Sequence, residues 1–171
     1  MNEKITIDVK KLTSSERERL IELAGKSSAD LDKESCVWKP KKKEHYYYVD
    51  SCNCVVRDNW DGIDVDEDRL NMGNVFKTEQ EAYFVAVRQK VKTELKKYAL
   101  EHNDPEKEAW NNDNGHYMIA FNHRVNDLFI TRGYYMEEES ATYFTSQEIA
   151  REAIMTIGRE RIAKYLFNVE V

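Results

Sequence analysis

The chain has 171 residues, of which 41% are hydrophobic and 34% charged, and this apolar content is sufficient for a core without disulfides. Its net charge of −6 argues against a basic nucleic-acid-binding domain, because nonspecific attraction to phosphate requires positive charge. No apolar run approaches the roughly 20 residues that cross a bilayer, no secretory signal opens the sequence, and its three cysteines do not suit a disulfide framework. We therefore expect a cytosolic protein without a membrane partner.

The first 37 residues predict a strand and a helix. Residues 4–9 alternate apolar and polar side chains, which is typical of a half-buried strand. Thr13 and Glu16 have the spacing of a capping box, in which each side chain satisfies a free backbone donor at the helix start. Gly25 is placed to end this helix, and a polar linker follows.

Residues 38–100 predict a β-hairpin followed by a long helix. The two strands cover residues 46–49 and 55–57 on either side of a short turn. An acidic loop, residues 58–68, then leads to a helix at about 78–100.

Two patterns define this long helix. Thr78 and Glu81 have the capping-box spacing at its start. A stripe of apolar residues with helical periodicity is expected to face the core, and its members are Phe84, Val87, Val91, Leu95 and Tyr98. Basic residues fill the polar sides, namely Arg88, Lys90, Lys92, Lys96 and Lys97.

Residues 101–109 are predicted to link this module to a second one, residues 110–171. The second module has strands at 117–121 and 128–131, and a helix at about 146–167. Gly158 lies inside that helix, where glycine costs about 1 kcal/mol relative to alanine. We expect it to mark a kink or a close helix contact.

The two modules resemble each other. The matched residues are Trp38, Tyr47, Val49 and Phe76 in the first module, and Trp110, Tyr117, Ile119 and Phe144 in the second. We predict an α+β fold in which an N-terminal strand and helix precede two pseudo-repeated β-hairpin-plus-helix modules. If the repeat is real, Phe76 and Phe144 are buried at matching sites.

Two groups of residues have the chemistry of metal ligands. The first is Cys36, His45, Cys52 and Cys54, which together would suit Zn²⁺. Cys-x-Cys in a turn is not the usual Cys-x-x-Cys arrangement, so we expect reduced thiols and keep zinc as the alternative. The second group is Asp58, Asp61, Asp64, Asp66, Glu67 and Asp68, whose oxygens would suit Ca²⁺ or Mg²⁺.

The acidic segment departs from the EF-hand pattern. Counted from Asp58, Trp60 occupies the third position and Arg69 the twelfth, where the pattern requires a glutamate. We expect a solvated acidic loop that pairs with Arg69, and no metal or cofactor. The alternative is that this surface presents phosphate-like charge to a basic groove of a protein partner.

A nucleic-acid site would combine charge with stacking. Four lysines precede the tyrosines of the first hairpin, namely Lys39, Lys41, Lys42 and Lys43. Lysines also protect strand edges from pairing, which is the alternative explanation. The four histidines have no cysteine or serine at a catalytic spacing, and no phosphate-binding loop is present, so we expect no enzyme.

The tyrosines suggest an interface. If Tyr47 and Val49 point into the core, strand alternation turns Tyr46 and Tyr48 outward. Tyrosine is enriched among residues that dominate binding energy. The candidate binding residues are Tyr46, Tyr48, Trp60, Asp61, Asp64, Asp66 and Asp68. The alternative is that the two rings cover the N-terminal helix or the other module.

Several sequence features together resemble a widespread group of small phage and prophage proteins of Gram-positive bacteria. They are Trp38, Tyr47-Tyr48-Val49, Trp60, Asp66, Arg69, residues 73–82, residues 143–150, Ile154, Ile157-Gly158 and residues 164–167. Members often carry a glycine-containing turn where this chain has Cys52-Asn53-Cys54, which argues against a family-wide cysteine function.

The resemblance implies a context rather than a chemistry. Phage accessory proteins of this size often bind and block a host machine. We therefore expect a protein of the host cytoplasm that binds a host macromolecule, such as a CRISPR effector or another defence system. A nucleic-acid or nucleotide binder is the alternative, and a homo-oligomer is compatible with either.

Overall fold

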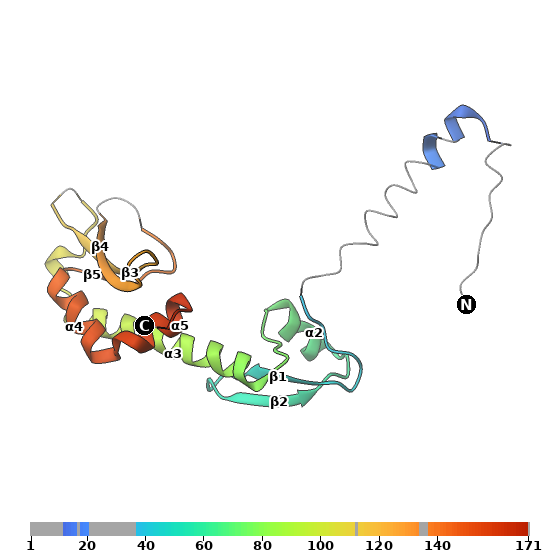
Figure 1. The fold of residues 1–171 in the computed structure, drawn as a ribbon, viewed down its shortest axis with the longest axis horizontal. Coiled ribbons are helices and arrows are strands. Elements are labelled where there is room, and N and C mark those ends of the chain that lie inside the picture. Colours follow the sequence, from blue (N-terminus) through green and yellow to red (C-terminus); the bar gives the residue numbers. More distant parts are fainter. Residues whose placement is uncertain (1–11, 17, 21–36, 112, 134–136, 171) are drawn as a thin grey trace. The chain divides into compact units, whose positions relative to one another are not determined.

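The computed structural model describes residues 12–16, 18–20, 37–111, 113–133 and 137–170. The chain separates into two units, Met1–Trp38 and Lys39–Val171. The second unit contains both hairpins and the helices that follow them (Figure 1). Its helices and antiparallel strands make this an α+β fold.

The capping box of the first unit is confirmed. The Thr13 amide donates to Glu16 Oε2 at 2.8 Å, and the Glu16 amide donates to Thr13 Oγ1 at 3.4 Å. Residues 14–16 and 18–20 are helical. The predicted strand at 4–9, Gly25 and the polar linker lie outside the described residues.

The first hairpin is confirmed, but the acidic loop is wrong in part. Strands β1 (His45–Val49) and β2 (Val55–Asn59) pair antiparallel, with Tyr47 opposite Arg57. The segment predicted as a loop contains helix α2 (Asp64–Asn71). Carboxylates in the first turn of a helix interact favourably with its unpaired N–H groups, which explains why this acidic stretch becomes helical.

Helix α3 (Glu79–His102) matches the predicted long helix. Its capping box is confirmed, because the Glu81 amide donates to Thr78 Oγ1 at 3.2 Å and the Thr78 amide to Glu81 Oε2 at 3.1 Å. Val91 and Leu95 of the predicted stripe are buried. A second buried face, Ala82 and Ala86, was not predicted.

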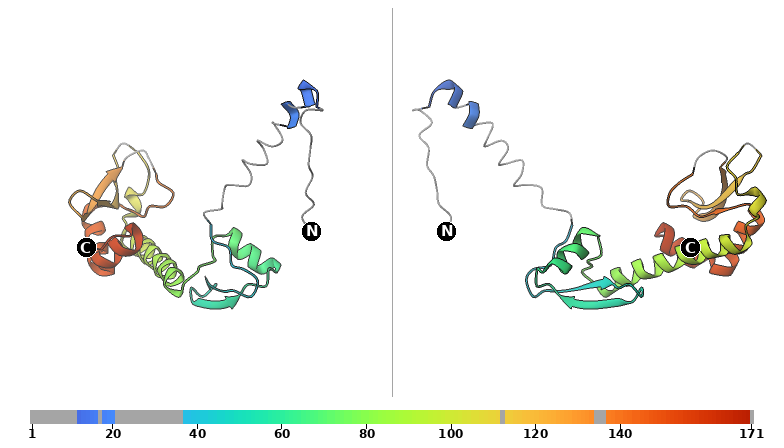
Figure 2. Two further views of the ribbon diagram at one scale, coloured as in Figure 1. Left: turned by 45° about the vertical axis from the view of Figure 1, so that its right-hand side comes forward. Right: turned by 180° about the vertical axis from the view of Figure 1, so that it is seen from behind.

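This second face explains the position of α3 between two sets of elements. The helix contacts β1 and β2 as well as α4 and α5. The views in Figure 2 agree that the first hairpin lies at the N-terminal end of α3, while α4 and α5 lie along its remaining length. The long helix therefore belongs to both modules.

The second module forms a three-stranded sheet. A short 3₁₀ helix, η2 (Pro105–Lys107), precedes strands β3 (His116–Asn122) and β4 (Asp127–Gly133), and these confirm the predicted hairpin. Strand β5 (Tyr143–Phe144) pairs with the other edge of β3, giving the order β4-β3-β5.

The helix predicted at 146–167 is two helices, α4 (Gln147–Ile157) and α5 (Arg159–Phe167). Gly158 between them has φ 102° and ψ 120°, a combination that residues with a Cβ rarely adopt. The glycine therefore separates two helices and does not merely kink one.

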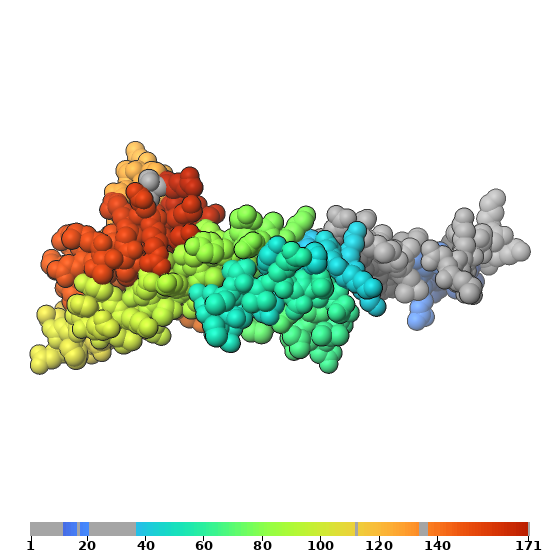
Figure 3. Space-filling model, turned by 90° about the horizontal axis from the view of Figure 1, so that it is seen from below, coloured from blue at the N-terminus to red at the C-terminus, as the bar shows by residue number. Residues whose placement is uncertain are grey.

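One hydrophobic core connects α3 with the second sheet and its helices. The buried members are Val91, Leu95, Ala99, Leu128, Phe144, Ala150, Ala153, Ile154, Ile162 and Ala163. Tyr117 and Ile119 pack against this cluster, as the strand alternation predicted. The space-filling view shows α4 and α5 lying directly against α3 (Figure 3).

Within the described ranges, no helix combines the length and the apolar character that crossing a bilayer requires.

Candidate functional site

The prediction that Tyr46 faces outward is wrong. The ring is fully buried, and its hydroxyl donates to Asp66 Oδ1 at 2.7 Å. Trp60, only 4% exposed, packs edge-on against it with ring centroids 5.7 Å apart. Tyr46 therefore has a packing role, but its observed partners, Trp60 and the α2 residues Asp66 and Arg69, belong to its own module and not to the N-terminal helix or the second module that the alternative named.

Asp66 is the polar centre of this packing. Its Oδ2 accepts from the backbone amides of Asp61 and Gly62, each at 3.0 Å, and of Ile63 at 3.4 Å. Burial opposes ionisation of this carboxyl, but the hydrogen bonds from Tyr46 and from the three amides hold its pKa below the usual range. Asp66 is therefore an ionised structural residue and is not part of an exposed acidic surface.

Arg69 completes the group. It donates to the Tyr46 hydroxyl and to Asp58 Oδ2, the latter at 3.0 Å, and its guanidinium carbon lies 3.6 Å from the centre of the Tyr48 ring. Burial and the hydrogen bond to Asp66 raise the pKa of Tyr46 to about 12, against the opposing effect of Arg69. The phenol therefore stays protonated and donates to the carboxylate.

We call Tyr46, Tyr48, Asp58, Trp60, Asp66 and Arg69 the hairpin–helix cluster. Its polar groups satisfy one another and hold α2 on the hairpin. Tyr48 is half-buried under Arg69, so it does not offer an open ring face. Three of the predicted binding residues lie outside the cluster and are exposed, namely Asp61, Asp64 and Asp68.

The predicted metal ligands are not brought together. His45 begins β1, whereas Cys52 and Cys54 lie in the turn beyond its far end, a separation of more than about 13 Å along a strand of this length. Cys36 lies outside the described residues. No group of three or more histidine, cysteine, aspartate or glutamate side chains in the described chain has a geometry that would hold a metal ion.

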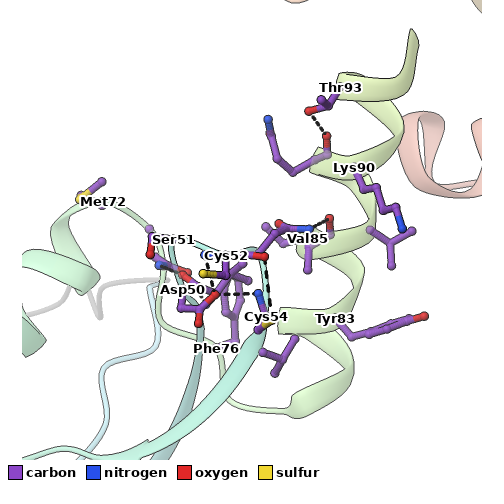
Figure 4. Close-up of a pocket in the computed structure, with 18 of the residues that line it drawn as sticks. Asp50, Ser51, Cys52, Cys54, Met72, Phe76, Tyr83, Val85, Lys90 and Thr93 are labelled. Carbon is purple, nitrogen blue, oxygen red and sulfur yellow. Dashed lines mark hydrogen bonds between the residues drawn. The ribbon is translucent and has the colours of Figure 1, made fainter. Parts of the chain in front are cut away.

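A different surface, which the sequence did not predict, lies between the hairpin turn and α3. It is an open groove of about 1230 Å³. The turn forms one side: Asp50 Oδ1 accepts from the amides of Cys52 and Cys54 at 2.9 and 2.7 Å, and Asn53 Nδ2 donates to the Ala86 carbonyl at 2.9 Å. The two Asp50 bonds shape the turn, and the bond from Asn53 holds it against the helix (Figure 4).

Apolar side chains line much of this groove. The half-buried ones are Val49, Val55, Phe76 and Val87. Met72 is 83% exposed, Tyr83 57% and Val85 38%, so the lining includes large apolar groups in contact with water. Figure 4 shows Met72 extending from the end of α2, while Tyr83 extends from α3 on the side away from the turn. We call this set the turn–helix groove.

The sequence contains one pattern that indicates part of the groove. Residues 83–87 are five consecutive apolar residues, and at 100° per residue they surround the helix. They cannot all face one core, so some of them must be exposed or meet a second surface. The contribution of Met72 had no comparable signal, because it depends on where α2 ends.

Comparison with protein-family models, curated proteins and solved structures found no match for this chain. The resemblance to phage proteins therefore stays an expectation.

Chemically, these surfaces suit binding. The carboxylates, the guanidinium and the Tyr46 hydroxyl of the hairpin–helix cluster are already hydrogen-bonded or ion-paired with one another. The turn–helix groove has an apolar lining with charged residues at its edge, among them Asp50, Lys90, Glu94 and Lys97. Glu94 is paired with Arg161, whereas no ion pair within the described ranges involves Lys90 or Lys97. The unpaired charges on the α3 side of the groove, those of Lys90 and Lys97, are therefore positive.

Proposed function

We propose that this chain is a phage-encoded accessory protein of the host cytoplasm that acts by binding a host protein, and that the turn–helix groove is its interface. The supporting observation is the exposed apolar lining of the groove, above all Met72, Tyr83 and Val85. Large apolar side chains exposed on a folded protein cost free energy in water, and places where they gather commonly mark interaction sites. Antagonism of a defence system such as CRISPR is the biological role that we infer from the resemblance.

The pseudo-repeat belongs to this proposal. Tyr47 forms an antiparallel bridge with Phe76, and Tyr117 pairs antiparallel with Phe144, so the matched residues have matched partners. Their burial differs, because Phe144 is fully buried whereas Phe76 is half-buried and lines the groove. We infer two copies of one unit. In the first copy, apolar surface around Phe76 is left open, whereas in the second copy α4 and α5 cover the corresponding surface around Phe144.

A capture experiment tests the interface. The tagged chain is incubated with host lysate, and retained proteins are identified and then purified for a binding titration. Replacing Met72 and Val85 by glutamine is expected to weaken binding about 10-fold or more, because each side chain loses apolar contact at the interface. The matched control is Met155→Gln on α4, where the methionine is 74% exposed and lies outside the groove.

The outcomes are distinct. Binding that survives in the groove variant, or that falls equally in the Met155 control, would show that the groove is not the interface. Unchanged melting temperatures of both variants would establish that the loss reflects contact rather than unfolding.

A nucleic-acid binder is the second candidate, and one observation favours it. Five basic residues of α3 have no ion pair with any residue that the structure describes, namely Arg88, Lys90, Lys92, Lys96 and Lys97. At 100° per residue they occupy two sides of the helix, Arg88, Lys92 and Lys96 on one and Lys90 and Lys97 on the other. Each side is a local positive surface on a chain of net charge −6. Retention of nucleic acid that declines steeply with salt would favour this candidate.

A further inference from the structure

A second pocket lies in the second module, separate from the turn–helix groove. It has a volume of about 210 Å³ and is bounded by α3, β3, the segment 138–142 and α5. None of its lining residues is shared with the groove. The pocket is therefore a site distinct from the groove, although both adjoin α3.

The floor of the pocket is apolar. Leu95 and Phe144 are 3% and 0% exposed and belong to the core, and Ile119, Leu166 and Phe167 are half-buried around them. An apolar body placed here would lose contact with water on several sides, which is favourable in proportion to the area covered.

The α3 side of the mouth is positively charged and has no internal counter-charge. Arg88 and Lys92 lie one turn apart, and the side chain of neither forms a hydrogen bond or ion pair with any other residue in the part of the chain described here. Lys92 is nevertheless half-buried. By contrast, the half-buried Arg161 is paired with Glu94. An ammonium without a carboxylate partner, held beside an apolar surface by the buried part of its side chain, can pair with an external anion.

The opposite side of the mouth contributes polar groups. Ser140 and Thr142 carry hydroxyls that can donate to an anion. The exposed Glu138 also lines the pocket and opposes an anion there, and its side chain pairs with no cation among the described residues. Two cations therefore face one carboxylate across the mouth, which leaves a net positive charge.

We propose that this pocket binds a small amphiphilic anion, with a carboxylate or phosphate headgroup between Arg88 and Lys92 and a short apolar body against Leu95 and Phe144. The volume equals that of about seven water molecules at about 30 Å³ each, and is below the roughly 300 Å³ at which drug-sized pockets begin. A headgroup and about five methylene-sized groups fill it, which is the size of hexanoate.

The test is a titration of the full chain with hexanoate, followed by NMR of the backbone amides. We expect saturable shifts at the pocket with a dissociation constant of about 0.1–10 mM, the range of such small ligands. Pentanol and pentylamine, which have the same five-carbon body without the negative charge, are expected to bind about 10-fold more weakly. Pentyl phosphate distinguishes the headgroups, since whichever of it and hexanoate binds more tightly identifies the preferred anion.

Variants assign the contacts. Arg88→Gln and Lys92→Gln are each expected to weaken hexanoate binding about 5- to 10-fold, since each removes one charged partner. Lys96→Gln is the matched control, because Lys96 is an exposed basic residue of the same helix that does not line the pocket. Glu138→Gln is expected to strengthen binding about 2-fold by removing like charge.

The proposal is overturned if pentanol binds as tightly as hexanoate, if no shift saturates by about 50 mM, or if Lys96→Gln weakens binding as much as Lys92→Gln. Because the substituted side chains are partly or fully exposed, the fold is expected to persist, and matching amide spectra of the free variants verify this.

Discussion

The hairpin–helix cluster makes Tyr46→Phe an informative single-atom change. The substitution keeps the buried ring and removes a hydroxyl that donates to Asp66 at 2.7 Å and accepts from Arg69. Asp66 is 2% exposed, so water does not readily replace the lost donor. A hydrogen bond to a charged group contributes about 1.5–3 kcal/mol, and Asp66 keeps its three backbone donors. We expect the free energy of unfolding to fall by about 2 kcal/mol.

Urea denaturation measures this change. Tryptophan fluorescence is a suitable signal, because one of the three tryptophans, Trp60, lies against Tyr46. Tyr46→Ala, which also removes the ring, is expected to cost about 5 kcal/mol or more. The matched control is Tyr83→Phe on α3, where the ring is 57% exposed, and a change within about 0.5 kcal/mol is expected. If Tyr46→Phe is as stable as the control, the buried hydrogen bonds do not hold α2 on the hairpin.

Two further changes test the same physical reasoning elsewhere. Because the folded-state pKa of Asp66 is depressed, its contribution to stability is present above the unfolded pKa of about 3.9 and is lost as the pH falls below it. The free energy of unfolding of Asp66→Asn should therefore vary less than that of the wild type between about pH 5 and pH 2, and parallel curves would contradict the depressed pKa. Gly158→Ala places a Cβ at φ 102° and is expected to cost about 1–3 kcal/mol by thermal unfolding. Thr156→Ala, an exposed position of α4, is its control and is expected to stay within about 0.5 kcal/mol; equal melting temperatures of the two variants would show that the glycine conformation is not required.

The sequence predicted what depends on local rules. The capping boxes at Thr13 and Thr78, both hairpins and the buried positions Val91 and Leu95 follow from side-chain spacing within a few residues. Spacing of this kind acts before any tertiary contact forms, which is why it survives in the folded chain.

Helix α2 and the orientation of Tyr46 could not be predicted in the same way. Its N-cap is Ile63, which has no side-chain hydrogen-bonding group, so the usual start signal is absent. Without α2, nothing in the sequence indicates that the Tyr46 face of β1 is covered. The sequence consequently predicts one exposed acidic surface, whereas the structure buries Asp66 and leaves Asp61, Asp64 and Asp68 exposed.

The candidate groove is a tertiary feature. It requires the turn at Asn53 to meet Ala86, a contact between residues 33 positions apart, and no periodicity reports such a meeting. The pocket at Arg88 and Lys92 likewise depends on β3 and α5 arriving at the same part of α3. Both sites therefore become visible only after the helix is placed against its neighbours.

The sharing of α3 limits how this protein can be divided for experiments. A cut at residues 101–109, where the sequence suggests a linker, would separate Val91, Leu95 and Ala99 from the buried faces of Phe144, Ile154 and Ile162. A fragment of residues 110–170 would expose that surface to water and is expected to aggregate, while the remaining piece would keep a helix with an uncovered apolar stripe. Fragments for crystallisation or interaction mapping should therefore retain residues 39–170 intact. After limited proteolysis within 101–109, the two pieces should stay tightly associated and should not separate as independent domains.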